Sequence, residues 1–280
     1  MIHNNITTDL ERAFYAISNS TVQNCEFSGP ADGESALKEC RNITVDKCKF
    51  YLRYPLWHLE KGKISQIYMS EGCRAPLWYD KDITIVDSDM HGTKALRECD
   101  RTLIDNCTIV SAEFGWFCRD VSIKNSSLTS EYPFLQTKRM EIDNLTLNGK
   151  YSFQYVEDVV ISNSNFATKD AFWHSKNVTV YDSIIKGEYL GWYAQNLKLV
   201  RCKIFGTQPL CYVENLVMED CEMIDCDLSF ENSTVDATII GNVTSVKNPA
   251  GGRIVADSYG EIILDEYVKE GTHTDIIKRT

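Results

Sequence analysis

Ile43-Thr44-Val45-Asp46-Lys47-Cys48-Lys49-Phe50 carries the pattern on which the fold depends. Its first, third, sixth and eighth positions are apolar or small, and polar residues fill the places between them. The octet can be followed in both directions along the chain, and from Thr102 onward each step is 19 residues long. A constant period of this length predicts a repeat architecture. The first position recurs at Ser20, Ile43, Gly62, Ile83, Thr102, Val121, Met140, Val159, Val178, Leu197, Leu216, Val235 and Ile254.

Each octet predicts two short strands separated by a corner. Alternation such as Val178-Thr179-Val180 turns one face of a strand inward. A third apolar segment, such as Ala36-Leu37-Lys38-Glu39-Cys40, precedes the octet and predicts a further strand. The corner between the first two strands needs a residue that tolerates the left-handed conformation, and Asn and Asp do so. This corner column contains Asn24, Asp87, Asn106, Asn125, Asn144, Asn163, Asp182 and Asp220.

Three strands and their bends leave no room for a helix within one period. A leucine-rich horseshoe shares the period, but its leucine-dominated signature is absent. A pentapeptide-repeat helix is excluded because the step is not a multiple of five. The sequence therefore predicts an all-β, single-stranded parallel β-helix of about 11–13 coils, each of roughly 19 residues, in which equivalent residues stack about 4.8 Å apart.

The chain reads as one domain over residues 1–270, followed by a polar tail at 271–280. Within the domain we expect an N-terminal cap at 1–18, regular coils at 19–242, and a C-terminal coil and cap at 243–270. A possible helix start at Thr8-Asp9-Leu10-Glu11 lies in the N-terminal cap. Caps are expected because an open β-helix would otherwise expose unpaired strand edges.

Most of the 11 cysteines fall into two columns of small residues. Neighbouring coils would hold these side chains about 4.8 Å apart, slightly beyond the Cβ separation of a disulfide. We therefore predict reduced thiols that pack in the core. The sixth-position column contains Cys25, Cys48, Cys107, Cys202 and Cys221, and the second small column contains Cys40, Cys99, Cys118 and Ala194.

All five tryptophans share the column that lies five residues before the first position of the octet. The next column is a mixture of polar and aromatic residues, and alternation alone does not decide which of the two columns faces solvent. We name Lys38, Trp57, Trp78, Tyr79, Arg97, Trp116, Trp173 and Trp192 as candidate ligand-binding residues. The columns can be interpreted as a strip that binds a saccharide or a protein, as an aromatic ladder that stabilises adjacent coils, or as a homo-oligomer interface.

Candidate catalytic residues are few. Glu39, His58 and Glu98 are the acids and the base of the second column in the early coils. Glu39 and Glu98 should lie three coils apart, roughly 14 Å, which is too far for a glycosidase carboxylate pair. Glu39 and His58 are expected to be neighbours on successive coils. The sequence predicts neither a metal site nor a cofactor.

The formal net charge of −11 argues against nucleic acid and anionic lipid as partners. The first residues lack the plan of a secretory signal, and no stretch approaches the length of a membrane-spanning helix. We therefore expect a cytoplasmic location.

The octet at Ile43, the segment Tyr54-Pro55-Leu56-Trp57, and Asp170-Ala171-Phe172-Trp173 resemble an uncharacterised bacterial domain family. The resemblance covers nearly the whole chain and implies a right-handed, pectin-lyase-like β-helix, but no known activity. The polygalacturonase motifs Asn-Thr-Asp, Asp-Asp and Gly-His-Gly are absent, and a pectate-lyase Arg-x-Pro-x-x-Arg segment is only half matched at Arg53 to His58. The first hypothesis is therefore a scaffold or binding protein of unknown function, and the alternative is a carbohydrate-active protein, of the lyase or hydrolase type, that uses the same strip.

Overall fold

A computed structural model describes residues 1–280, and every regular element in it is a strand. The chain forms a parallel β-solenoid of about 15 turns, whose turns follow one another about 19 residues apart. This confirms the predicted fold class. The structure contains no helix that could span a bilayer. Two compact units, Met1–Glu141 and Ile142–Thr280, make up the chain and are described in turn as unit 1 and unit 2.

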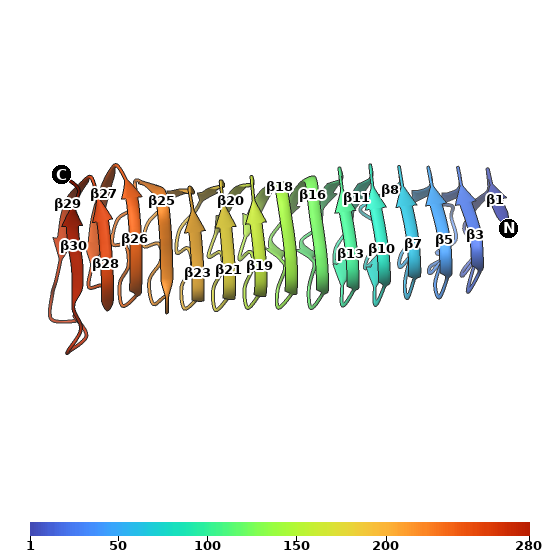
Figure 1. Ribbon diagram of the computed structural model, residues 1–280. Helices are drawn as coiled ribbons and strands as arrows, with labels where there is room; N and C mark the ends of the chain where they lie inside the picture. Colours follow the sequence, from blue (N-terminus) through green and yellow to red (C-terminus); the bar gives the residue numbers. More distant parts are fainter. The chain divides into compact units, whose positions relative to one another are not determined.

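Unit 1 is built from long strands that pair in parallel with the equivalent strands of the next coil (Figure 1). Its strands are β1 (Ile2–Asn4), β2 (Thr7–Thr8), β3 (Ser18–Gln23), β4 (Glu26–Phe27), β5 (Arg41–Asp46), β6 (Lys49–Phe50), β7 (Glu60–Ser65), β8 (Tyr68–Met69), β9 (Leu77–Trp78), β10 (Lys81–Val86), β11 (Asp89–His91), β12 (Leu96–Arg97), β13 (Asp100–Asp105), β14 (Thr108–Val110), β15 (Glu113–Phe114), β16 (Arg119–Ser130) and β17 (Tyr132–Pro133). The first position of each octet is paired with the first position of the next, as in Ile83 with Thr102.

Unit 2 repeats this arrangement, with β19 pairing β21 and β21 pairing β23 in the same register. The strand β18 (Lys138–Lys150) contains the boundary between the units. The remaining strands are β19 (Glu157–Ser162), β20 (Asn165–Lys169), β21 (Lys176–Tyr181), β22 (Ile184–Lys186), β23 (Gln195–Val200), β24 (Lys203–Phe205), β25 (Leu216–Ile224), β26 (Thr234–Ile240), β27 (Asn242–Lys247), β28 (Gly251–Ala256), β29 (Ser258–Ile263) and β30 (Thr274–Lys278).

Both ends of the chain differ from the sequence prediction. Part of the predicted cap at 1–18 is a coil, because β1 pairs with β3 and β2 pairs with β4. Part of the predicted tail is also a coil, because β30 pairs with β28. These two coils raise the number of coils above the predicted 11–13. The sequence does not predict them because neither β1 nor β30 has a strongly buried alternating face. The assignment of residues 1–270 to one domain stays a prediction.

Two local predictions are wrong. No helix begins at Thr8, because Thr8 ends strand β2 and residues 11–16 form turns. The last 19-residue step is also wrong, because Val235 pairs with Gly252, and Ile254 pairs with Ala237. The step is two residues shorter, since one residue is lost at the corner before Ile239, which pairs with Cys221, and another before Val246, which pairs with Ser229.

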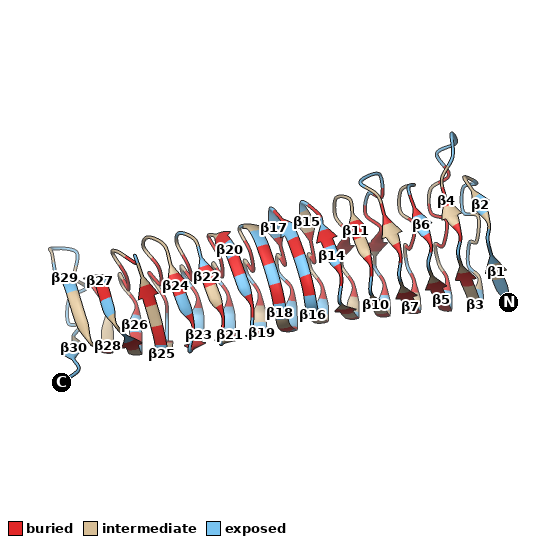
Figure 2. Cartoon of the chain, turned by 90° about the horizontal axis from the view of Figure 1, so that it is seen from above, coloured by how far each residue is buried: buried red, intermediate tan, exposed pale blue.

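The core lies inside each coil, where the predicted inward positions are buried. Ile43, Val45, Cys48 and Phe50 are all inaccessible to solvent or nearly so. Figure 2 shows the resulting alternation of buried and exposed residues along strands such as β16. The third apolar segment is buried as expected, but only some of its copies, such as β9 and β12, are strands, and the copy at Ala36 is a turn.

The corner column adopts the left-handed conformation that its composition predicts, with φ between 47° and 55°. Small residues follow most corners because their side chains bind backbone there. The Sγ of Cys107 donates to the carbonyl oxygen of Asp105, and the Oγ of Ser126 donates to that of Lys124. All eleven cysteines are free and buried, which confirms the predicted reduced core thiols.

Replacement of Cys107 tests the sixth-position column. Cys107→Ser should change the free energy of unfolding by no more than about 1 kcal/mol, since Ser126 makes the same bond one coil away. Cys107→Leu should destabilise by about 1–3 kcal/mol through overpacking. Urea unfolding measures both changes, and an equal loss of stability in the two variants would show that side-chain size does not select the residue at this position.

Because burial raises the pKa of the Cys107 thiol to about 11, we also expect this thiol not to react with a thiol reagent in the folded protein at pH 8.

Candidate functional site

The aromatic strip of unit 1 consists of two adjacent columns on one corner of the coils. The inner column is Lys38, Trp57, Trp78, Arg97 and Trp116, and the outer column is Glu39, His58, Tyr79, Glu98 and Phe117. Every outer-column residue has a left-handed backbone, with φ between 52° and 63°. A left-handed residue breaks the alternation of the strand, so both columns point away from the core. This answers the question that sequence alone left open.

The cations of the inner column lie against its indole rings. The Nζ of Lys38 is 4.8 Å from the centre of the Trp57 ring. The guanidinium of Arg97 lies between Trp78 and Trp116, at 5.0 and 5.1 Å from their ring centres. These cation–π contacts explain why Lys and Arg share a column with Trp. They also cover much of the indole faces, so that the inner column is half-buried.

The indole N–H groups bind to neighbouring coils. In unit 1, Trp78 donates to the carboxylate of Glu98 at 3.2 Å, and Trp116 donates to the backbone carbonyl of Tyr132. In unit 2, Trp173 donates to the carbonyl of Tyr189 and Trp192 to that of Gln208. Four of the five predicted ligand-binding tryptophans thus tie one coil to another through their N–H groups. The N–H of Trp57 is buried and has no partner.

The outer column of unit 1 presents polar groups and rings to solvent. Tyr79 is 41% exposed, and its ring meets the ring of His58 edge to face at 5.0 Å. The Nδ1 of His58 lies 3.1 Å from the Oε1 of Glu39, which confirms the predicted acid–base neighbours. Glu98 is occupied with Trp78 and Arg97, so it does not form a carboxylate pair with Glu39. No three His, Cys, Asp or Glu side chains converge in a metal-binding group.

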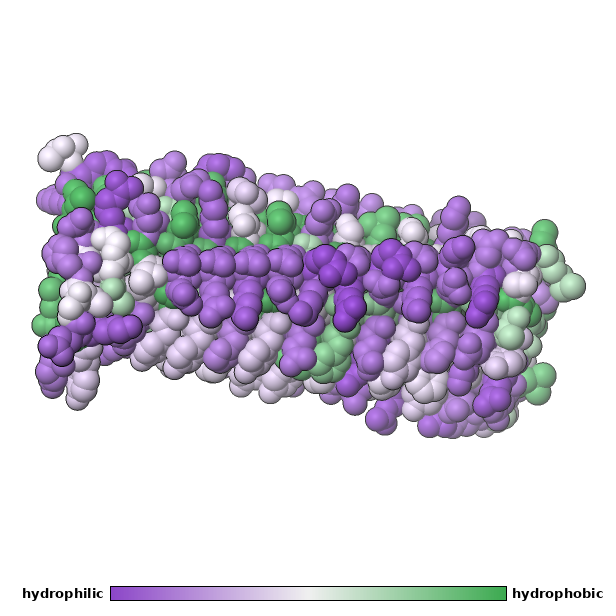
Figure 3. Space-filling model, turned by 60° about the horizontal axis from the view of Figure 1, so that its bottom comes forward, coloured by the Kyte–Doolittle hydropathy of each residue, from purple (hydrophilic) through white to green (hydrophobic).

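Unit 2 has its own aromatic columns. Trp173 and Trp192 stack with their ring centres 5.6 Å apart and their planes at 5°. Beside them, four rings form a ladder in which each ring is 4.9–5.0 Å from the next: Tyr155, His174, Tyr193 and Tyr212. Their faces contact one another, so solvent reaches mainly ring edges and phenol oxygens. Figure 3 shows that side chains of similar hydropathy form rows along the surface, with hydrophilic rows beside paler ones.

Asp80 is a residue of the site that sequence reasoning missed. It follows the exposed Tyr79 but is completely buried, and its Oδ1 accepts a hydrogen bond from the backbone N–H of Leu59 at 2.7 Å. Its Oδ2 has no partner. From the core side, the carboxyl of Asp80 thus fixes the backbone next to His58. The sequence does contain a signal for this buried carboxyl, because Asp80 is the acidic member of the second small column, which also contains Cys40, Cys99 and Cys118.

Asp80 should make the stability of the protein depend on pH. Burial raises its pKa well above the usual value, so the folded state keeps the proton at a pH where the unfolded chain has lost it. Stability should therefore fall as pH rises from about 4, the pKa of an unfolded Asp, towards the folded-state pKa. Thr137 occupies the equivalent place and supplies a neutral hydroxyl that accepts from the N–H of Cys118.

Asp80→Thr should accordingly remove this slope. We expect the variant to be more stable than the wild type at pH 8, on the order of 1–3 kcal/mol, with a smaller difference at pH 4. Urea unfolding across this range measures the effect. A constant difference between the two proteins would contradict the assignment of a neutral, buried carboxyl.

Two solved structures and one family model are similar to this chain. A surface adhesin of Streptococcus pneumoniae, PfbA, is 10% identical with a TM-score of 0.46, covering 95% of this chain and 85% of that one. A tailspike protein of E. coli bacteriophage HK620 is 9% identical with a TM-score of 0.42, covering 98% of this chain and 66% of that one. No curated protein matches the chain. The family model described as "Protein of unknown function (DUF3737)" matches residues 1–277, and the chain therefore belongs to this family.

Proposed function

We propose that this protein is a binding scaffold that holds a saccharide on the outer column of the unit 1 strip. The observation that carries the proposal is the exposed ring of Tyr79 next to His58, with Glu39 in contact with the imidazole. A saccharide offers hydroxyl groups together with apolar ring faces. The outer column offers carboxylate and imidazole acceptors beside an aromatic surface, repeated at the coil spacing of about 4.8 Å.

In this proposal the two columns have different roles. The faces of Trp57 and Trp78 are largely occupied by Lys38, Tyr54 and Arg97. The inner column therefore positions the outer one, and Tyr79 and His58 make the contacts. A direct ligand-binding role for the tryptophans stays a prediction.

A glycan array run on the wild type and on Tyr79→Ala tests this function. We expect the wild type to bind a subset of glycans and the variant to lose at least about tenfold in affinity, which corresponds to a contact residue worth about 1.4 kcal/mol or more. Tyr267→Ala is the matched control, since Tyr267 is 69% exposed and lies in unit 2. Trp57→Ala and Trp78→Ala should also lose binding. Thermal unfolding of both variants shows whether this loss reflects a local change beside Tyr79 and His58 or unfolding of the protein. A wild type that binds no glycan, or a Tyr79→Ala variant that binds as well as the wild type, would reject the proposal.

The second candidate is a carbohydrate-active enzyme that uses the same column. The specific observation is the 3.1 Å contact between Glu39 and His58, in which the carboxylate can orient the imidazole as a general base. If this candidate is right, glycans bound on the array are cleaved, and His58→Gln lowers the rate by about 100-fold or more. The assay follows new reducing ends or unsaturated products by mass spectrometry, with Glu39→Gln as a second variant. Binding without any product would leave the scaffold as the function and reject the enzyme.

A further inference from the structure

A groove on a different corner of unit 1 follows the Asn and Asp corner column. One part of it, of about 590 Å³, is lined by residues that include Lys47, Gln66, Tyr68, Asp87 and Asn106. A second part, of about 340 Å³, is lined by residues that include Asn5, Asn24 and Glu26. Lys47 and Lys49 line both parts, so the two hollows meet at these lysines. The rows from Asn5 to Asn106 belong to six successive coils, which corresponds to a length of roughly 24 Å.

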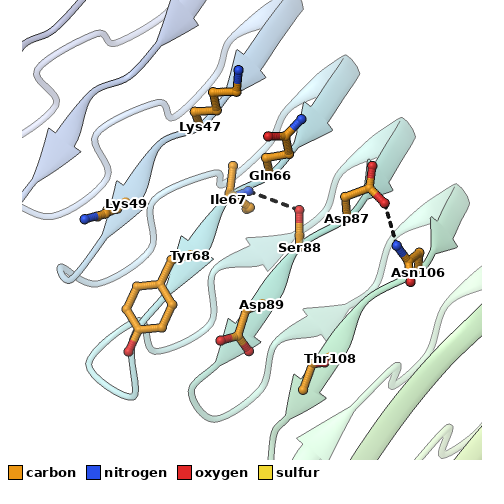
Figure 4. A pocket seen from close by; sticks show the side chains of 10 residues that line it. All are labelled: Lys47, Lys49, Gln66, Ile67, Tyr68, Asp87, Ser88, Asp89, Asn106 and Thr108. Carbon is orange, nitrogen blue, oxygen red and sulfur yellow. Dashed lines mark hydrogen bonds between the residues drawn. The ribbon is translucent and has the colours of Figure 1, made fainter.

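Figure 4 shows how the side chains are arranged in this groove. Lys47, Gln66, Asp87 and Asn106 come from the corner, while Lys49, Tyr68, Asp89 and Thr108 come from the strands that follow it. In register, Tyr68 pairs with Lys49 on one side and with Asp89 on the other. The corner residues and the strand residues therefore form two parallel rows, with the buried Ile67 and Ser88 between them.

Two corner residues at the centre of the groove have side chains without a partner. Towards either end of the groove, Asn106 donates a hydrogen bond to Asp87, and Asn24 donates to Asn4, the residue before the corner of the preceding coil. The side chains of Lys47 and Gln66 make neither a hydrogen bond nor an ion pair within the chain. Lys49 lacks an ion pair as well. Two lysines without a carboxylate partner thus lie on the same side of one coil, in a chain whose formal charge is −11.

We propose that this groove binds an acidic oligosaccharide, with an anionic group on Lys47 and Lys49 and hydroxyl groups on the amide and carboxylate side chains to either side. The ammonium groups of Lys47 and Lys49, which have no carboxylate partner within the chain, can form charge-assisted hydrogen bonds with an anionic group. The flanking Gln66, Asp87 and Asn106 are the donors and acceptors that sugar hydroxyls use. A bound peptide would need buried apolar anchors, and beyond Ile67 and the ring of Tyr68 the lining is polar.

Isothermal titration calorimetry on the full chain tests the proposal with three hexasaccharide probes. Hyaluronan carries carboxylates, chondroitin sulfate carries carboxylates and sulfates, and chitohexaose is neutral. We expect at least one acidic probe to bind, at least about tenfold more tightly than chitohexaose and more weakly as salt rises. Equal binding of both acidic probes assigns the anionic group to the carboxylate, and binding of chondroitin sulfate alone assigns it to the sulfate.

The double variant Lys47→Gln/Lys49→Gln should weaken binding of the acidic probe at least about tenfold. It should fold normally, because Gln66 already occupies the same corner column with φ of 51°. Lys61→Gln/Lys63→Gln is the matched control, since it removes the same charge from exposed positions of the next coil outside the groove. This control variant should bind the acidic probe like the wild type. The proposal would be overturned if neither acidic probe bound, if chitohexaose bound equally well, or if the double variant kept full binding.

Discussion

Backbone hydrogen bonds between successive coils hold equivalent positions of the octet opposite one another, and every other feature of the structure depends on this register. Ile83 lies opposite Thr102, and Val178 lies opposite Leu197, because parallel strands repeat their pairing at every coil. A residue type that suits one place therefore recurs as a column. Small residues fill most places in the column after the corner because their hydroxyl and thiol groups bind carbonyl oxygens there. Larger apolar residues fill the other inward columns.

The corners decide what the surface offers. At one corner Asn and Asp take the left-handed conformation at little cost, and the groove of unit 1 follows them. At another, residues as large as Tyr and His take the same conformation. Stacking offsets that cost, since the coil spacing of about 4.8 Å is close to the separation that aromatic rings prefer. The ladder from Tyr155 to Tyr212 in unit 2 shows this match most clearly.

The tryptophans illustrate how a conspicuous residue can have a supporting role. In unit 1 cations lie against the indole rings, and in unit 2 the two indole rings stack on each other. Most of the indole N–H groups bind to another coil. Groups that remain available to a ligand lie beside them, at Tyr79 and His58, and on a separate corner, at Lys47 and Lys49. In both proposals, therefore, the ligand contacts side chains beside the tryptophan column rather than the tryptophans themselves.

The sequence by itself determined the repeat, the inward positions, the left-handed Asn and Asp corners, the reduced thiols and the contact between Glu39 and His58. These follow from periodicity, because residues one step apart in a regular stack must be neighbours. Only the tertiary structure decided the exposure of the two aromatic columns, the partners of the indole N–H groups, the burial of Asp80 and the position of the groove. It also revealed the end coils and the shortened step to Gly252. The reason is physical: a period reports which residues stack, whereas exposure and hydrogen bonding depend on the backbone angles at each corner and on side chains that reach across from adjacent coils.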